Sequence, residues 1–234
     1  MSVFNPIRFV ARVFLNSLDR MEYWLATKRT LHGVPVVIGL ISSSYQEEDE
    51  ALEKIDGALK LIAVYAPKNF GSLNKVVSSI LVTSGVWAYG LYHPERKIIQ
   101  LNGDYVTNPE TTHQDVACTL IHEAQHGRLY RMGFGYEDAV RTRIERICMT
   151  AERNFARNLP DSEALVANLE ERLELDWEPY LTDEEMWRSD KAAKMKVIRD
   201  FGMPDWIIRL LEWKLRRTEQ RNFPRKLASH IDYT

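Results

Sequence analysis

Apolar residues at helical spacing predict two consecutive helices in the middle of the chain. The first should begin at Asn108-Pro109-Glu110, because asparagine caps helices, proline suits the first helical position and an acid favours the first turn. It should end at Gly133, where glycine supplies a left-handed C-terminal cap. The apolar positions that recur between these limits are Val116, Leu120, Ile121, Ala124 and Leu129.

A second helix is predicted over about residues 136–158, after the turn Gly133-Phe134-Gly135. Its apolar stripe consists of Val140, Ile144, Ile147, Ala151 and Phe155. Because the turn is short and carries glycine, we expect the second helix to fold back antiparallel to the first.

Strand-like runs precede these helices. Residues 86–92 and 97–102 are rich in apolar and β-branched residues, and His93-Pro94-Glu95-Arg96 between them is a turn signal, so the two runs predict a hairpin. Residues 79–83 predict another strand. Residues 34–41 predict one more, although a buried helix segment would give the same apolar run.

Both ends of the chain are predicted to be helical. Residues 5–31 carry an apolar face accompanied by Arg8, Arg12 and Arg20, which suits a helix packed on its own domain or, as the less favoured alternative, a membrane-surface helix. The arginines break every apolar run long enough to span a bilayer. Past Pro160, a helix should start at Thr182-Asp183-Glu184-Glu185 and run to about residue 201, and a last helix should follow Gly202-Met203-Pro204-Asp205.

These elements predict an α+β fold that is mainly helical, with a small sheet or hairpin beside the first middle helix. We expect residues 1–160 to form one domain and residues 161–234 to form a helical region packed on it. With 234 residues, 45% of them hydrophobic, the chain can bury one sizeable core. Its formal net charge of −2 argues against a general nucleic-acid binder, and the basic C-terminal end suits a solvated face.

Two cysteines, Cys118 and Cys148, lie one in each middle helix. Neither has the paired spacing of a zinc ribbon, so we expect reduced core thiols, with a disulfide between them as the alternative. The chain shows no secretory signal pattern, which favours a reducing, cytoplasmic location.

The run His122-Glu123-Ala124-Gln125-His126 carries the clearest chemistry. Positions four apart share one face of a helix, so both imidazoles can reach one metal ion while Glu123 flanks it. This arrangement is typical of metal-assisted hydrolysis. The alternative is a pair of solvent-exposed histidines on a polar helix.

Catalytic zinc usually takes a third protein ligand, and an acid on the second helix can supply it. At about 1.5 Å per residue, His126 and His122 lie roughly 9 and 15 Å from the end of the first helix, and Glu145 lies about 13 Å along an antiparallel second helix. Glu152 overshoots by roughly 10 Å, so Glu145 is the predicted ligand and Glu152 an alternative or a supporting residue. The competing role for Glu145 is a salt bridge with Arg141.

The motif and its surroundings resemble the zincin metallopeptidases, within them the gluzincin type whose third ligand is a glutamate on a following helix. The resemblance covers about residues 78–158. It departs from the family at Arg128, where a hydrophobic residue is usual, and at Met149, where thermolysin-like gluzincins carry an acid that orients a histidine. A second resemblance, to the sequences of uncharacterised bacterial zinc-peptidase-like proteins, is carried by Arg143-Ile144-Glu145-Arg146-Ile147-Cys148 with Ala151-Glu152 and Phe155-Ala156.

The resemblance implies a zincin-like catalytic domain that hydrolyses peptides or proteins with Zn²⁺ held by His122, His126 and Glu145. Glu123 would act as general base. The hairpin would hold an extended peptide by its edge, with a purely structural hairpin that covers the core as the alternative. Candidates for stabilising the oxyanion or contacting substrate are Tyr136, His93, His113 and Arg141. The alternatives are a zinc-stabilised binding module without catalysis and a zinc hydrolase acting on another substrate.

Overall fold

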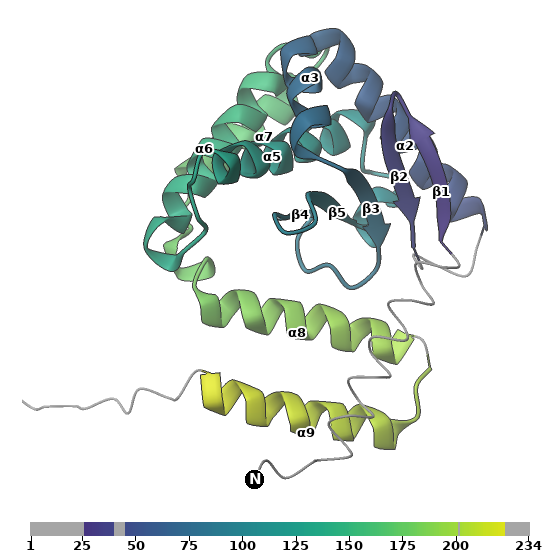
Figure 1. The fold of residues 1–234 in the computed structure, drawn as a ribbon, viewed down its shortest axis with the longest axis vertical. Helices are drawn as coiled ribbons and strands as arrows, with labels where there is room; N and C mark the ends of the chain where they lie inside the picture. Colours follow the sequence, from purple (N-terminus) through teal and green to yellow (C-terminus); the bar gives the residue numbers. More distant parts are fainter. Residues whose placement is uncertain (1–25, 40–44, 201, 223–234) are drawn as a thin grey trace, which may run out of the picture.

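The computed structural model describes residues 26–39, 45–200 and 202–222 (Figure 1). Most of the predicted N-terminal helix, residues 5–25, lies outside them. The end of that prediction is wrong, because Thr27–Leu31 form strand β1. β1 pairs antiparallel with β2, Val34–Ile38, through a tight turn in which His32 and Gly33 both have positive φ.

A five-stranded sheet forms one layer of the protein. Its other strands are β3 (Ser79–Thr83), β4 (Gly90–His93) and β5 (Ile98–Asn102). The strand order is β1-β2-β3-β5-β4, with β2, β3 and β5 parallel to one another and β4 antiparallel to β5 at the edge. The predicted hairpin is therefore present, but its first strand begins at Gly90 and residues 86–89 form a loop.

Helices pack on one face of this sheet. The described helices and their bounds are α2 (Tyr45–Tyr65), α3 (Pro67–Val76), α4 (Gly103–Val106), α5 (His113–Arg131), α6 (Asp138–Ala156), α7 (Glu163–Glu174), α8 (Asp183–Asp200), α9 (Asp205–Asn222) and a 3-10 turn at Glu178–Tyr180. The core lies between the sheet and α2 and α5, where Ile38, Ile80 and Leu101 are fully buried. The architecture is α+β, as predicted.

Helix α5 begins later than its sequence pattern suggests. Thr112, not Asn108, caps it, because the Thr112 hydroxyl accepts the Asp115 amide while the Asp115 carboxylate accepts the Thr112 amide. Asn108–Glu110 form a turn instead, in which the Asn108 side chain accepts the Glu110 amide. The predicted end is confirmed, since Gly133 has φ +88°.

Helix α6 follows the glycine-bearing turn and packs against α5. Its predicted stripe is only partly right, because Ile144 and Phe155 are buried whereas Val140 and Ile147 are exposed. The buried face instead includes polar or sulfur-containing side chains, namely Arg141, Cys148, Met149 and Glu152. The face that α6 turns inward is therefore set by polar partners as well as by apolar packing.

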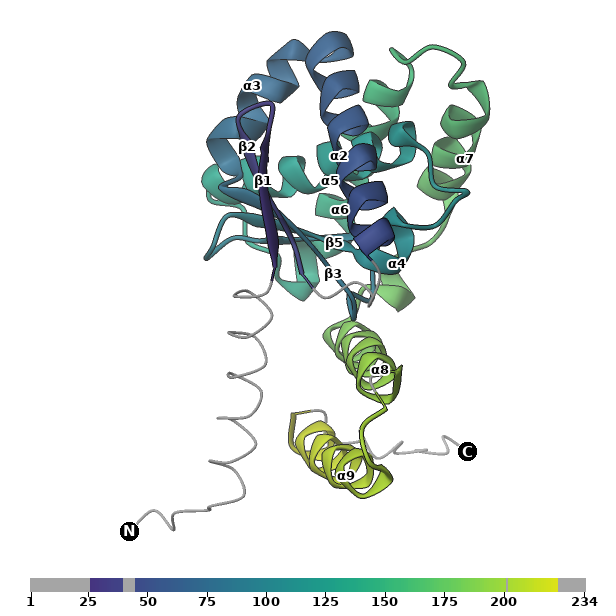
Figure 2. The same ribbon diagram turned by 90° about the vertical axis from the view of Figure 1, so that its right-hand side faces the viewer.

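Only part of the C-terminal region packs on the sheet and the helices that cover it. Helix α7 contacts α6, and α8 approaches the loop after β3, where a Cβ on Gly85 would lie 3.1 Å from Val197. Helices α8 and α9 lie side by side, away from the layer of α2, α5 and α6 (Figures 1 and 2). Helix α9 exposes Trp206 and Trp213. Among the helices that the structure describes, none has the length and apolarity needed to cross a membrane.

The cap of α5 gives a test of this fold. Thr112→Ala removes the hydroxyl that accepts the Asp115 amide and should lower the free energy of unfolding by about 1 kcal/mol. For a domain of this size that corresponds to a fall of roughly 2–4 °C in Tm, measured by calorimetry or circular dichroism. An unchanged Tm would show that the helix does not depend on this cap.

Candidate metal centre

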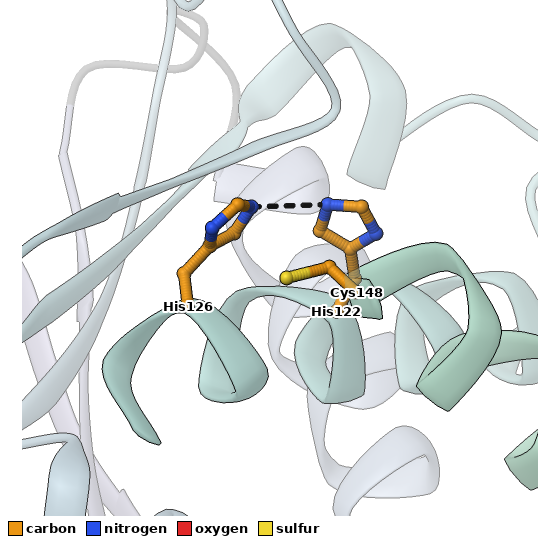
Figure 3. Close-up of side chains that lie close together, drawn as sticks. All are labelled: His122, His126 and Cys148. Carbon is orange, nitrogen blue, oxygen red and sulfur yellow. Dashed lines mark hydrogen bonds between the residues drawn. The ribbon is translucent and has the colours of Figure 1, made fainter. Parts of the chain in front are cut away.

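His122 and His126 lie one turn apart on α5 and point to the same place. Their Nε2 atoms are 3.2 Å apart, and their ring centroids are separated by 5.0 Å with the planes tilted by 58° (Figure 3). Both side chains are largely buried, with 12% and 14% of their surface exposed. The helical spacing of the motif thus brings the two imidazoles together on one face of α5.

Glu145 reaches both histidines from α6. Its Oε2 lies 3.2 Å from His122 Nε2, and its Oε1 lies 3.3 Å from His126 Nε2. The alternative salt bridge between Glu145 and Arg141 does not form in the structure. Arg141 pairs instead with Asp138 and Asp183.

Glu152 approaches His122 from the other side of the ring. One of its oxygens lies 3.1 Å from His122 Nδ1, and the other lies 3.6 Å from the guanidinium of Arg172 on α7. A carboxylate only accepts hydrogen bonds, so Nδ1 donates a proton to Glu152, and the proton that Nε2 shares with Glu145 is the one that a bound metal ion would displace. Glu152 therefore orients His122, and the task that Met149 cannot perform falls to a residue three positions later.

The pKa values of this cluster follow from burial and these contacts. Burial opposes the charged form of His122, but hydrogen bonds to Glu145 and Glu152 outweigh it and hold the pKa of His122 well above its usual range. Burial likewise favours the neutral form of Glu145, yet hydrogen bonds from His122 and His126 hold its pKa well below the usual range. The cluster thus stabilises positive charge at its centre.

The donor set fits a divalent cation. In a tetrahedral site with metal–ligand distances of about 2.0–2.1 Å, neighbouring ligand atoms are roughly 3.3 Å apart. The two imidazole Nε2 atoms are 3.2 Å apart, and each lies 3.2–3.3 Å from a different oxygen of the Glu145 carboxylate. With neutral imidazoles, the carboxylates of Glu123, Glu145 and Glu152 (−3) and the guanidinium of Arg172 (+1) leave a charge of −2, which a divalent ion would neutralise.

Cys148 lies beside the same cluster, a position that its sequence context did not reveal. Its Sγ and one nitrogen of each histidine all lie within 4.8 Å of one another (Figure 3). Both cysteines are free and buried, as expected for core thiols, and burial raises the pKa of the Cys148 thiol. The signal in the sequence was the spacing of three residues from Glu145, which puts both side chains near one face of α6.

The spacing favours Glu145 over Cys148 as the third ligand. Each carboxylate oxygen of Glu145 is already at a ligand–ligand distance from one imidazole, and the carboxylate accepts hydrogen bonds from both, whereas the thiol is placed only within 4.8 Å of the two rings. Either chemistry suits zinc.

Glu123 is buried next to both histidines of the motif. The residue is 5% exposed, and within the described part of the chain its carboxylate has no hydrogen-bond partner. Burial raises the pKa of Glu123, although the nearby imidazoles oppose the shift. Gly90 on β4 makes room for it, because a Cβ there would lie 2.9 Å from Glu123 Cγ and 3.2 Å from Oε1.

The cluster lies in a cleft of about 440 Å³. Helices α5 and α6 supply the polar groups, and residues 87–92 with Pro94 form a wall that includes the edge strand β4. A further wall comes from the chain after α7, through Trp177, Leu181 and Met186. Apart from the cluster and Arg172, the lining is predominantly apolar and aromatic.

Of the four residues predicted to contact the oxyanion or the substrate, only one lies in the lining of the cleft. Tyr136 lines the cleft, and its hydroxyl donates a hydrogen bond to Glu145 Oε1. His93 is outside the cleft lining and pairs with Gln100 at 2.6 Å. His113 begins α5 and packs against Gly57 of α2. Arg141 is outside the cleft lining and donates hydrogen bonds to the carbonyl oxygens of Tyr136 and Leu181, two residues that do line the cleft.

No protein-family model, curated protein or solved structure matches this chain.

Three variants separate the ligand candidates. Glu145→Gln removes the charge between the imidazoles and should weaken zinc affinity by more than about a hundredfold, whereas Glu152→Gln should weaken it by about tenfold, since it only misorients His122. The zinc affinity of Cys148→Ser should stay within a few-fold of that of the wild type. Competition titration against a chelator measures all three, and a larger loss for Cys148→Ser than for Glu145→Gln would assign the thiol as ligand.

Proposed function

We propose that this protein is a zinc-dependent peptidase with a zincin-like catalytic core. The observation that carries the proposal is the convergence of His122, His126 and Glu145 on one point. Beside them lies the buried carboxylate of Glu123, which has no hydrogen-bond partner among the residues that the structure describes. A structural site needs only ligands, whereas a hydrolytic site also needs a base beside an open position.

The finer description of the fold as gluzincin-like rests on the order of its parts. The motif lies on α5, the carboxylate comes from the following helix α6, and an antiparallel edge strand, β4, runs beside the cleft. This order agrees with the resemblance seen in residues 78–158. The orienting acid is Glu152, on the same helix as Glu145.

The resident metal of the proposal is zinc, held by His122 and His126 through Nε2 and by the Glu145 carboxylate. When bound, zinc would lower the pKa of a water molecule and polarise the scissile carbonyl. Glu152 keeps the His122 ring in the tautomer that ligation requires, and Tyr136 fixes Glu145 from the other side.

Glu123 would act as the general base. Its raised pKa, caused by burial, brings the carboxyl closer to the neutral pH at which proton transfer is efficient. We expect Glu123 to accept a proton from the attacking water and to deliver it to the leaving nitrogen. The lack of a competing hydrogen bond leaves its oxygens available for both steps.

Strand β4 would hold the substrate. Among the described strands it pairs with β5 alone and is the last strand of the sheet, and its residues Gly90, Leu91 and Tyr92 line the cleft. An extended peptide can add to such an edge through backbone hydrogen bonds. Of the four oxyanion candidates, Tyr136 is the one whose side chain lies in the cleft, so it is our candidate for contacting the substrate carbonyl. Its hydroxyl would have to exchange its hydrogen bond to Glu145 for one to the substrate.

A zinc-stabilised binding module is the second candidate function, and Cys148 favours it. If the thiol joined the two imidazoles and Glu145, four protein ligands would close the site and leave no position for water. A test that removes the base without touching the ligands distinguishes the two functions.

Glu123→Gln is that test. It preserves size and removes the proton acceptor, so zinc content and fold should be unchanged while peptide cleavage falls by at least about two orders of magnitude. Cleavage of an unbiased peptide library, followed by mass spectrometry, gives the comparison. Equal cleavage by both proteins would remove Glu123 from the mechanism, and no cleavage by zinc-loaded wild type would favour the binding module.

Gly90→Ala tests the placement of Glu123 without changing any polar group. The added methyl would lie 2.9 Å from Glu123 Cγ, so it should displace the carboxylate and lower kcat/KM by about ten- to a hundredfold with zinc retained. Gly71→Ala is the matched control, because a Cβ at Gly71 on α3 has no atom within 4 Å. Full activity in Gly90→Ala would contradict this role for the Glu123 position.

A further inference from the structure

The wall that follows α7 is the part of the cleft that the proposed chemistry does not use. Trp177, Leu181 and Met186 line it, at the start and end of the 3-10 turn and in the first turn of α8. Trp177 is held in place by its indole nitrogen, which donates to the Arg172 carbonyl at 2.7 Å. These three side chains, called here the C-terminal wall, offer only apolar and aromatic surface together with a thioether.

Arg141 anchors this wall to α6. Arg141 is 4% exposed, and its guanidinium donates to the Leu181 carbonyl and the Asp183 carboxylate on one side. On the other side it donates to Asp138 at 2.9 Å and to the Tyr136 carbonyl at 3.2 Å. A planar group with five donors can join several acceptors in this way, which lysine cannot do.

The same anchor reaches the candidate metal centre. The Arg141 guanidinium lies 5.0 Å from the Tyr136 ring centroid, and that ring meets His126 edge-on at 5.4 Å. Tyr136 donates in turn to Glu145. The C-terminal wall, Arg141, Tyr136 and Glu145 therefore form one connected set of contacts.

The lining also limits which side chains can enter. Its charged groups are those of the cluster and Arg172, and Arg172 is paired with Glu152. A charged side chain placed against Trp177, Leu181 and Met186 would lose its hydration without finding a partner. An apolar side chain has no such hydration to lose, and burying its surface against these residues would favour binding.

We infer that the C-terminal wall is a specificity subsite for a large apolar side chain of an extended peptide, and that Arg141 is the positioning residue that holds it. This inference rests on the proposed peptidase function. It names the substrate class as peptides with a leucine-like or phenylalanine-like residue near the scissile bond, and it assigns the selection to residues outside the metal motif.

Matched peptides that differ at one position test the subsite. Wild type should cleave peptides with Leu or Phe at the selected position at least about tenfold faster, in kcat/KM, than the same peptides with Lys or Glu. Met186→Glu puts a carboxylate into the wall and should shift preference towards Lys by a similar factor. Leu210→Glu on α9, which is 41% exposed and outside the cleft lining, should leave the preference unchanged.

Arg141→Gln tests the anchor with a readout that does not require activity. Loss of the guanidinium should raise hydrogen–deuterium exchange of residues 177–186 by at least about threefold, with zinc content retained. The preference for apolar residues should fall in the same variant. Arg143→Gln, an exposed neighbour on α6, is the control and should change neither quantity.

The outcomes separate this inference from the peptidase proposal. Cleavage of all matched peptides at equal rates, or a Met186→Glu preference identical to wild type, would overturn the subsite and leave the peptidase proposal intact. Absence of cleavage by zinc-loaded wild type would overturn both. Unchanged exchange of residues 177–186 in Arg141→Gln would remove Arg141 from its positioning role.

Discussion

The antiparallel packing of α5 against α6 is the constraint on which the rest of the site depends. It brings a carboxylate from one helix level with two imidazoles from the other, so that Glu145 lies 3.2 Å from His122 and 3.3 Å from His126. A buried cluster of this kind is unfavourable unless its charges are balanced. Its −2 charge with neutral imidazoles means that protons or a divalent cation must occupy the centre, and the geometry suits the cation.

Residues around the cluster hold its ligands in position. Glu152 and Arg172 fix His122 from α6 and α7, while Tyr136 and Arg141 connect Glu145 to the C-terminal wall. Glu123 stands apart because its carboxylate has no partner in the described residues and is accommodated only because Gly90 lacks a side chain. The site thus combines side chains held by several bonds with one carboxylate left available. That division agrees with separate tasks of metal binding and proton transfer.

Local patterns in the sequence predicted the motif helix well. The apolar stripe of α5 and the glycine after its last turn are set by residues close together in the sequence, and the structure contains both. The start was misplaced because Thr112 and Asp115 form a reciprocal cap that outweighs the signal of Asn108 and Pro109. The His32-Gly33 turn that makes Thr27–Leu31 a strand was also a readable signal, and it was missed.

Residues whose roles depend on distant partners could not be predicted. Arg141 was a candidate for contacting substrate, but its partners include Leu181 and Asp183, about 40 positions along the chain. The helical rise placed Glu145 correctly beside the histidines, yet it implied that Glu152 overshoots. In the structure Glu152 meets the far nitrogen of His122, and its second partner, Arg172, comes from a helix that the sequence pattern did not delimit. Helices α2 and α3, which build the core behind the site, also went unpredicted.

Anomalous X-ray diffraction at the zinc absorption edge, from crystals of the zinc-loaded protein, tests the central claim most directly. The account predicts one zinc peak per chain, about 2.0–2.2 Å from His122 Nε2, His126 Nε2 and a Glu145 oxygen, with the fourth position free of protein atoms and next to Glu123. A peak with Cys148 Sγ as a fourth ligand at about 2.3 Å would contradict the catalytic assignment, and no peak between the two histidines would contradict the metal centre itself.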